Sequence, residues 1–495
     1  MKRYYFTILL ILSGIFSALL QAWLNIPLLA FIAFAPMMYA LCTADGKTQY
    51  LLRFAYFFIP YYIVQLSFLV TVYHIVPLPK FFAVIVMGIV VLLLSLWESL
   101  LMFVPLFMLM WLKRGKITDI FVVSLLICGG EWLQENIIIL HFPWSAVWLT
   151  VTDMPIFMQT ANLLGCRVVT FIILVTNGLL AFIVMSDKKL VSISLLAIVQ
   201  SITVFYGIYS LSHLDKISSA SQKINVICAQ DEIEGERKKD ISSLTSAKSY
   251  ISILNDNWVV GTSLVLLPET AVSTDYDESL DEFKMLKDFA VEKGCTVVTG
   301  CFFNDGKDYN AMYAISPAGK ISSPYCKQVL VPFGERMPFS FLFGESTLSE
   351  CRDNEKIQPL RTSEMSIGAS ICIESIYPDI VRRLAKSGSD LLCISTNDSW
   401  FGKSFARQQH YRHSIMRAVE NGKYLLRAGN CGISAVISPN GKVMAQRTDS
   451  AKGICSCEIS LINEKNLYSK WGNIFITLPI LLITLAIIRR FTTQA

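Results

Sequence analysis

Long apolar runs separated by short polar connections fill the first 211 residues of the chain. Seven such runs lie in this half, and an eighth lies near the C-terminus. They occupy residues 5–23, 26–41, 54–76, 81–112, 120–140, 155–185, 191–211 and 474–488. A helix needs about 20 apolar residues to cross the hydrocarbon core of a bilayer, so most of these runs predict transmembrane helices. The run 26–41 is short for a span, and the run 81–112 is longer than one span requires.

From residue 223 the pattern changes to short β-type runs that alternate with amphipathic helical segments. Strands are predicted at residues 224–228, 263–267, 296–303, 312–315, 367–372, 391–395, 424–427 and 434–438, the last followed by an Asn440-Gly441 turn and a further strand. Helices are predicted at residues 242–257, 280–293, 377–387 and 405–421. This alternation favours a layered α/β fold. We therefore expect a multi-span α-helical membrane domain with about seven spans at 1–215, an α/β domain at 222–462 and a C-terminal transmembrane helix at 472–489.

The composition is that of a chain with a large surface in lipid. Hydrophobic residues make up 53% of the sequence and charged residues 16%, whereas soluble proteins carry about 25% charged residues. The net charge of +5 is small and its basic residues are scattered, which argues against nucleic acid as a partner.

Basic residues gather at every second connection between the apolar runs. They are Lys2, Arg3, Lys47, Arg53, Lys113, Arg114, Lys116, Lys188, Lys189, Arg489 and Arg490. The intervening connections, around Asn25, 77–80 and Pro143, carry almost no positive charge. Because cytoplasmic loops are enriched in Lys and Arg, the pattern places both termini in the cytoplasm and the α/β domain outside it. The first run resembles a signal peptide, but its length and the closeness of the next run favour a retained span.

Ten of the thirteen cysteines lie at or beyond Cys228, in the part of the chain predicted to be outside. A chain of this length buries a core without crosslinks, so they do not indicate a disulfide framework, although wrong disulfides are a risk there. Cys455 and Cys457 form one close pair, and His410 and His413 lie three residues apart on a predicted helix. Neither pair has further ligands at metal-site spacing, so we predict no metal and no cofactor.

Polar and aromatic candidates also lie in the membrane half. Glu131 and Glu135 fall in the second half of the run 120–140, and Trp144 and Trp148 follow it. Ionisable groups at membrane depth usually face a bundle interior or a cavity. The alternative is helix packing by the carboxyl groups and an interfacial aromatic belt formed by the tryptophans.

Three candidate catalytic side chains follow predicted strands of the α/β domain. They are Glu269 in Leu-Leu-Pro-Glu-Thr, Lys327 after a predicted hairpin, and Cys372 at the end of an apolar strand. A cysteine at a strand-to-helix elbow can project its sulfur at the rim of a sheet, and the backbone N–H of Ile373 can hold an oxyanion. Taken singly, the glutamate and lysine are ordinary solvated residues, and the cysteine is an ordinary buried one. Glu335 is predicted to support the three by orienting Lys327 or assisting proton transfer. Glu374 is predicted to do likewise or to pair with a neighbouring cation.

The order Glu…Lys…Cys, with these local contexts, resembles the carbon–nitrogen hydrolase (nitrilase) superfamily. The fuller resemblance is to its membrane branch, the apolipoprotein N-acyltransferase family, and it covers nearly the whole chain. The segments that carry it are Glu131-Trp-Leu, Phe142-Pro-Trp144, Leu330-Val-Pro-Phe-Gly-Glu335, Thr396-Asn-Asp-Ser-Trp-Phe-Gly402, Gln409-His410, Met416-Arg-Ala-Val-Glu420 and Leu426-Arg427.

The resemblance implies a nitrilase-like αββα sandwich in which Cys372 is the nucleophile, Glu269 the general base and Lys327 the cation near the oxyanion. It also implies a bacterial cytoplasmic (inner) membrane protein with a periplasmic catalytic domain. The donor would be a phospholipid of the phosphatidylethanolamine type, and the acceptor the α-amino group of a diacylated apolipoprotein. The substrate-binding candidates are Trp144, Trp148, Glu131, Asn397, Trp400, Phe401, Gln409 and Arg427.

Two other functions compete with this interpretation. A membrane-bound nitrilase-type amidase would resolve the acyl-enzyme with water, and a non-enzymatic membrane receptor or assembly factor would need no intact triad. Arg336, Ile373 and the lack of a Trp soon after Gln230 depart from the family pattern. These positions bear on lipid contacts, so they affect donor preference and not the class of reaction.

Overall fold

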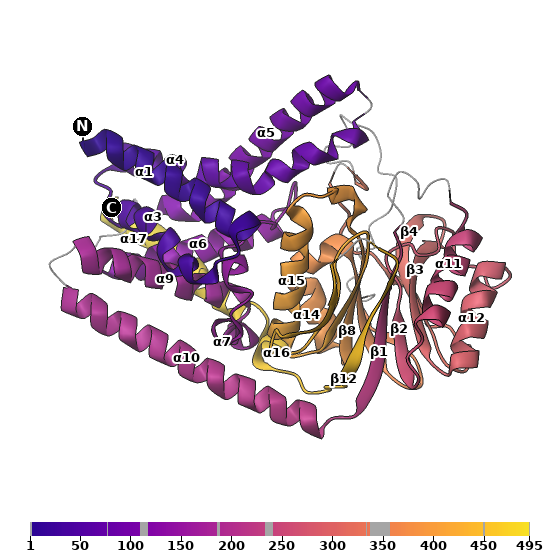
Figure 1. Ribbon diagram of the computed structural model, residues 1–495. Coiled ribbons are helices and arrows are strands. Elements are labelled where there is room, and N and C mark those ends of the chain that lie inside the picture. The colour runs from indigo at the N-terminus through magenta and orange to yellow at the C-terminus, as the bar shows by residue number, and fades with distance from the viewer. Residues whose placement is uncertain are drawn as a thin grey trace. The chain divides into compact units, whose positions relative to one another are not determined.

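The computed structural model describes residues 2–76, 78–108, 117–185, 189–232, 241–332, 334–336, 357–448 and 451–494, and the chain divides into two compact units (Figure 1). The first unit comprises residues 1–209, 404–409 and 473–495, and the second comprises 210–403 and 410–472. Four basic residues used in the orientation argument, Lys113, Arg114, Lys116 and Lys188, lie outside the described residues.

The first unit is built from helices. They are α1 (Lys2–Leu19), α2 (Ala30–Ala33), α3 (Ala35–Cys42), α4 (Lys47–Leu66), α5 (Lys80–Phe107), α6 (Thr118–Asn136), α7 (Pro155–Met158), α8 (Ala161–Leu164), α9 (Cys166–Met185), most of α10 (Lys189–Ala220), and α17 (Thr477–Gln494). Within the described residues, five segments are long and apolar enough to cross a membrane: Tyr4–Leu24, Lys47–His74, Lys80–Phe107, Cys166–Met185 and Lys189–Ala220. The prediction of a multi-span membrane region is confirmed.

Three predicted spans are not among these five, and the C-terminal one forms a shorter apolar helix, Ile474–Leu485. The run 26–41 is divided into a 3-10 turn, α2 and α3. Asn25, just before the run, adopts a left-handed conformation, Pro27 begins the 3-10 turn, and Pro36 lies in the first turn of α3. Helix α6 forms where predicted but carries Asp119, Glu131 and Glu135. The count of about seven spans, and the span at the C-terminus, therefore stay predictions.

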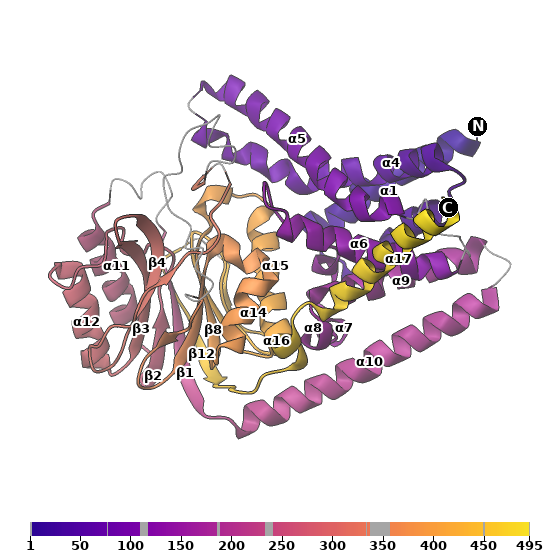
Figure 2. The same ribbon diagram turned by 180° about the vertical axis from the view of Figure 1, so that it is seen from behind.

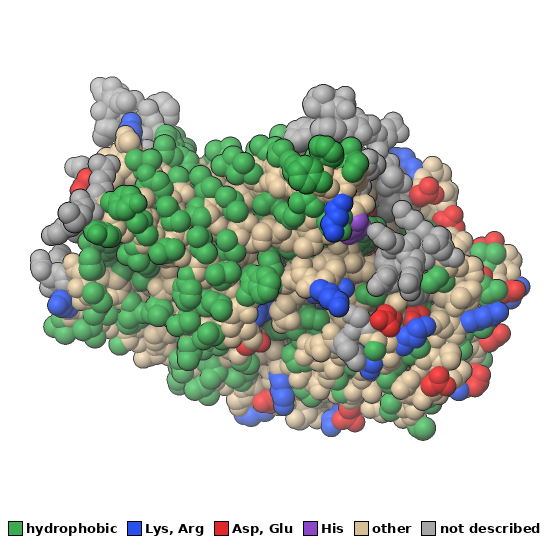
Figure 3. Space-filling view, turned by 45° about the horizontal axis from the view of Figure 1, so that its top comes forward, with side chains coloured by type: hydrophobic (Ala, Val, Ile, Leu, Met, Phe, Trp, Pro, Cys, Tyr) green, Lys and Arg blue, Asp and Glu red, His purple; other side chains and the backbone are tan. Residues whose placement is uncertain are grey.

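Large hydrophobic side chains cover the outside of the helical unit, as Figure 3 shows for one face. Leu51, Phe81, Leu93, Val184 and Phe205 are between 48% and 78% exposed. Contiguous apolar surface of this extent is unfavourable in water and favourable against lipid. The exposed surface of these helices is therefore the part of the protein suited to the bilayer.

The second unit contains two six-stranded sheets, with the strand orders β12-β1-β2-β3-β4-β5 and β11-β10-β9-β8-β7-β6. The first sheet consists of β1 (Lys223–Gln230), β2 (Thr262–Leu266), β3 (Thr296–Asn304), β4 (Asp308–Ile315), β5 (Tyr325–Cys326) and β12 (Gly453–Ser460). The second consists of β6 (Leu360–Arg361), β7 (Ser366–Ile371), β8 (Leu391–Asn397), β9 (Leu425–Asn430), β10 (Ser434–Ile437) and β11 (Val443–Arg447). The central strands β1-β2-β3 and β7-β8-β9 are parallel.

Helices cover the outer faces of both sheets (Figures 1 and 2). Helices α11 (Ser243–Asp256) and α12 (Asp281–Lys293) pack on the first sheet through an apolar core that includes Tyr250, Leu286 and Val265. Helices α14 (Pro378–Lys386) and α15 (Ala406–Asn421) lie beside the second sheet, and α16 (Leu467–Trp471) packs against α14. The sheets face each other, since the Ser395 hydroxyl donates to the backbone oxygen of Leu267 at 2.7 Å. This arrangement confirms the predicted αββα sandwich.

Candidate active site

The three predicted catalytic side chains each follow a strand, and folding brings them to one edge of the sandwich. Glu269 lies three residues after β2, Lys327 directly follows β5, and Cys372 directly follows β7. The Nζ atom of Lys327 lies 3.0 Å from Oε1 of Glu269, and both charges act on the Cys372 thiol. All three side chains are buried. The two sheets together therefore assemble a carboxylate, an ammonium and a thiol that are far apart in the sequence.

The backbone at Cys372 is left-handed, with a φ of +51°. Thr270, next to Glu269, has a φ of +46°. This conformation costs free energy for any residue except glycine, and such residues cluster at functional sites. A 3-10 turn, Cys372–Ile376, begins at the cysteine. The N–H of Ile373 comes before the turn's own hydrogen bonds begin, so it is placed to serve as the predicted oxyanion donor.

Three donors hold the carboxylate of Glu269. Its Oε1 atom accepts from Asn310 Nδ2 at 2.8 Å and from Lys327, and its Oε2 atom accepts from the backbone N–H of Asn397 at 2.9 Å. The carboxylate is therefore buried, and fixed hydrogen-bond donors hold both of its oxygens. Asn310 was not predicted as a site residue, because it lies two residues before the predicted strand 312–315, although the structure places it within β4.

Glu335 contacts Lys327, as expected of a residue that orients it. Its Oε1 atom lies 2.8 Å from Lys327 Nζ, and its Oε2 atom accepts from the backbone N–H of Val331 at 2.9 Å. Lys327 therefore lies between two carboxylates. An ammonium has three N–H donors, so one remains after these two contacts.

Glu374 ties the segment around Lys327 to the turn that carries Cys372. Its Oε2 atom accepts from the Tyr325 hydroxyl at 2.8 Å and from the Ile371 N–H at 2.7 Å, and its Oε1 atom accepts from the Gln328 N–H. The predicted alternative, an ion pair with a neighbouring cation, is not what these contacts show. Glu374 instead fixes the backbone on both sides of the site.

Replacing Glu374 with glutamine is expected to destabilise the protein by about 1–3 kcal/mol. The NH2 group of the new amide would face the hydroxyl and N–H groups that donate to the carboxylate in the wild-type protein. Burial raises the pKa of Glu374 from 4.5 to about 7, although the N–H groups of Ile371 and Gln328 act in the opposite direction. A group whose pKa is raised in the folded protein contributes its full stabilisation at a pH below its pKa in the unfolded protein. For Glu374 this contribution is lost as the pH rises through about 7. Thermal unfolding of both proteins from pH 5 to 8 should therefore show a difference that shrinks with rising pH. A constant difference would contradict the assignment.

Cys372, the predicted nucleophile, is protonated in the structure as it stands. Burial and the Glu269 carboxylate raise the pKa of Cys372 well above its usual value, while Lys327 and Thr396 act in the opposite direction. Burial also disfavours the ammonium of Lys327, yet the charges of Glu269 and Glu335 raise its pKa well above the usual value. The lysine thus stays charged, and the thiol must lose its proton during attack. Glu269, whose charge acts on this thiol, is the candidate acceptor of that proton.

Four substrate-binding candidates lie in the second unit. Asn397 is buried, and its backbone N–H donates to Glu269. Arg427 is also buried. The ring of Phe401 lies edge-on to that of His410 at 5.7 Å. Trp400, in contrast, is 41% exposed.

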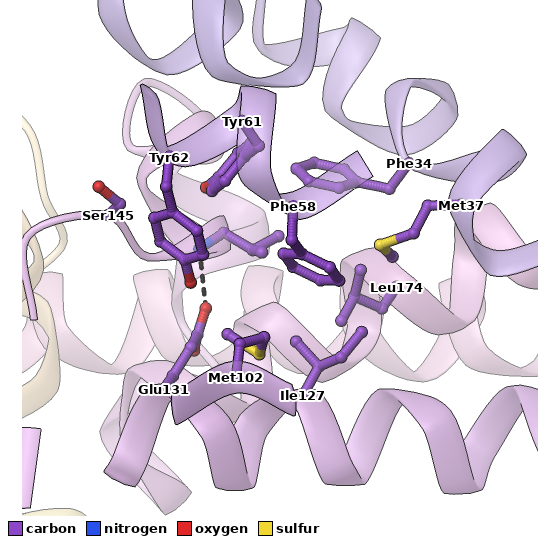
Figure 4. Close-up of a pocket in the computed structure, with 11 residues that line it drawn as sticks. Phe34, Met37, Phe58, Tyr61, Tyr62, Met102, Ile127, Glu131, Ser145 and Leu174 are labelled. Atoms are coloured by element: carbon purple, nitrogen blue, oxygen red, sulfur yellow. Dashed lines mark hydrogen bonds between the residues drawn. The ribbon is translucent and has the colours of Figure 1, made fainter. Parts of the chain in front are cut away.

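The other four candidates lie in the first unit and are buried. Trp144 donates from Nε1 to Oε1 of Gln409 at 2.7 Å. Glu131 accepts from the Val147 N–H at 2.8 Å and, with Tyr62 and others, lines a cavity in the helical unit (Figure 4). Trp148 is 3% exposed. The interfacial-belt alternative thus does not describe Trp144 and Trp148, which are packed inside the unit.

Of the cysteines that the structure describes, all but Cys457 are buried. Cys228 and Cys455 lie opposite each other on β1 and β12. Burial also raises the pKa of Cys393, so its thiol stays protonated. Inert buried thiols lower the risk of wrong disulfides with Cys372.

Comparison with known proteins covers most of the chain. Residues 13–179 match the apolipoprotein N-acyltransferase N-terminal domain, and residues 240–465 match the carbon–nitrogen hydrolase family. An apolipoprotein N-acyltransferase of Geobacter metallireducens is 28% identical over 94% of this chain and 91% of its own length. That of Haemophilus influenzae is 30% identical over 67% of each chain.

Solved structures with similarity to the chain include Nit3 of Saccharomyces cerevisiae, a member of branch 10 of the nitrilase superfamily. It is 20% identical, with a TM-score of 0.40, and the match covers 50% of this chain and 93% of Nit3. A carbon–nitrogen hydrolase of Helicobacter pylori G27 is 18% identical, with a TM-score of 0.40, over 51% of this chain and 94% of its own. From these relatives and the two matched domains, we conclude that this chain belongs to the apolipoprotein N-acyltransferase family.

Proposed function

We propose that Cys372 carries an acyl chain from a phospholipid to the α-amino group of the diacylglyceryl-cysteine that begins an apolipoprotein. The observation that supports this most directly is the contact of Lys327 with Glu269 beside the buried thiol of Cys372. An acyl-transfer centre of this kind in a chain with several apolar helices suits a donor and an acceptor that are both lipids.

In the first step, Glu269 takes the thiol proton as the sulfur attacks the ester carbonyl of the phospholipid. Negative charge then develops on the carbonyl oxygen. The remaining N–H of Lys327 and the N–H of Ile373 stabilise that charge in a water-poor site. The ester C–O bond breaks, the leaving alkoxide receives the proton from Glu269, and a lysophospholipid departs. A thioester on Cys372 remains.

In the second step, the amine of the acceptor attacks the thioester carbonyl, and Glu269 takes a proton from the nitrogen. The C–S bond breaks, the thiolate is protonated again, and the product is an amide. Amines react more readily with thioesters than with oxygen esters, which gives a chemical reason for a sulfur nucleophile. The same two donors serve both tetrahedral intermediates.

The finer assignments are part of the proposal. The alternation of basic connections supports a bacterial cytoplasmic membrane location with both termini inside and residues 222–462 in the periplasm. A phospholipid of that outer leaflet, of the phosphatidylethanolamine type, would be the donor. Among the binding candidates, exposed Trp400 is assigned a lipid contact, whereas buried Trp144, Gln409 and Arg427 support their surroundings.

Trapping the acyl-enzyme tests the proposal. Purified protein incubated with phospholipid and no acceptor should gain the mass of one acyl group on the peptide that contains Cys372, and hydroxylamine should remove it. Adding a diacylated lipopeptide with a free α-amino group should discharge the enzyme and yield the triacylated peptide. Release of free fatty acid without peptide product would favour the hydrolase alternative. Failure to label Cys372 at all would exclude it as the nucleophile.

A further inference from the structure

A second buried cluster contacts the backbone of Cys372, the proposed nucleophile. The ring of His410, in α15, is fully buried, and its Nε2 atom lies 3.0 Å from the backbone oxygen of Cys372. A carbonyl oxygen only accepts hydrogen bonds, so Nε2 must carry the proton and donate it. The histidine therefore contacts the backbone of the proposed nucleophile.

The imidazole is itself held in place. Its Nδ1 atom lies 2.9 Å from Oδ1 of Asp398 and 3.1 Å from Nη2 of Arg427. Arg427 also donates from Nη2 to Oδ2 of Asp398 at 2.8 Å, and Thr396 donates to Oδ1 of the same carboxylate at 2.9 Å. Asp398 is fully buried, and the charges of Arg427 and His410 hold its pKa well below the usual range although burial opposes this.

The contact matters because of peptide geometry. The carbonyl of Cys372 and the N–H of Ile373 belong to one planar trans peptide, so they point in opposite directions. Fixing the carbonyl on His410 therefore fixes the direction of the Ile373 N–H. The left-handed φ of +51° at Cys372 is unfavourable without support, so the turn needs a contact of this kind to keep one orientation.

We propose that His410 is a positioning residue that locks the Cys372–Ile373 peptide, so that its N–H faces the oxyanion of both tetrahedral intermediates. Asp398 and Arg427 fix the imidazole in that role. This inference rests on the proposed acyl transfer through Cys372 and adds to it the element that keeps the oxyanion donor in place. A positioned donor costs no reorganisation when charge develops, whereas a mobile one does.

The test compares two reactions of the same sulfur. Acylation by phospholipid develops an oxyanion, whereas alkylation by iodoacetamide occurs at a methylene carbon and develops none. In His410→Asn the new amide nitrogen lies near the former Nδ1 and cannot reach the Cys372 carbonyl. In His410→Gln it lies near the former Nε2 and can. Both rates are followed by mass spectrometry of the Cys372 peptide in the full-length protein.

For His410→Asn we expect acylation to slow about 10²-fold with little change in the KM for phospholipid, while alkylation keeps its wild-type rate. His410→Gln should recover much of the loss. His410→Met, of similar size and without a donor, provides a second variant with the same expected selective loss if the asparagine variant does not fold. His413→Asn, at an equally buried histidine three residues along α15, controls for the loss of a buried imidazole and should acylate normally.

Equal slowing of acylation and alkylation in His410→Asn would overturn the inference, because the substitution would then have changed the reactivity of the thiol or the fold. An equal loss of acylation in His413→Asn would overturn it too. An unchanged acylation rate in His410→Asn would overturn it as well. Failure of the proposed function looks different, since the wild-type protein would then be alkylated at Cys372 but never acylated.

Discussion

Substitution of Cys372 by alanine is expected to abolish N-acylation, with a loss of about 10⁴-fold or more, because no other group can form the thioester. Serine at this position should be nearly as inactive. Burial and the Glu269 carboxylate already disfavour the charged form of the thiol, and a hydroxyl is much less acidic. The measurement is conversion of a diacylated to a triacylated lipopeptide by purified full-length protein.

Cys457→Ala is the matched control, because that thiol is the one described cysteine that is partly exposed, and it lies on β12, away from the site. It should retain wild-type activity. Thermal unfolding shows whether each variant is folded, so that a loss of activity can be assigned to the missing thiol. A Cys372→Ala protein that still acylates the lipopeptide would remove the basis for the proposed mechanism.

The sequence predicts most of the sandwich because its strands are short apolar runs bounded by turn residues. The Asn440-Gly441 turn joins β10 to β11 as expected, and Gly441 has the positive φ that such a turn needs. Strand β4 begins at Asp308, four residues before the predicted start, because it pairs antiparallel with β3 along its whole length. Pairing with a neighbour extends a strand beyond what its own pattern indicates.

The candidate site is predictable only in part. Glu269, Lys327 and Cys372 stand in recognisable contexts at strand ends, so their meeting could be expected. Asp398 and His410 lie in segments that carry the family resemblance, but a single sequence does not show that their side chains are buried or that they contact each other. The contacts of Asp398 and His410 are defined only by the packing of β8, β9 and α15 in the folded protein.

The membrane half shows a different limit. Its apolar runs predict spans, because length and composition are enough for that. They do not predict which polar groups pair inside the unit. Trp144 and Gln409 are 265 residues apart in the chain, yet each satisfies the other in a buried hydrogen bond. A candidate chosen for binding a substrate can therefore be occupied by an internal partner.

Replacement of Lys327 by methionine is expected to lower the rate of acyl-enzyme formation by at least about 10²–10³-fold, because one oxyanion donor is lost. The variant should also be less stable by about 3–5 kcal/mol, since removing the cation leaves the Glu269 and Glu335 carboxylates unpaired in a buried site. Acyl-enzyme formation is followed by mass spectrometry of the Cys372 peptide, and stability by thermal unfolding.

A double variant separates the two effects. Lys327→Met with Glu335→Gln removes one positive and one negative charge, so the site keeps the balance of the wild-type protein. If Lys327 stabilises the oxyanion directly, the double variant should regain stability but remain slow in acylation. If the lysine serves only to balance the two carboxylates, both stability and acylation should recover together. The first outcome supports Lys327 as a catalytic residue, and the second would reduce its role to electrostatic support of Glu269.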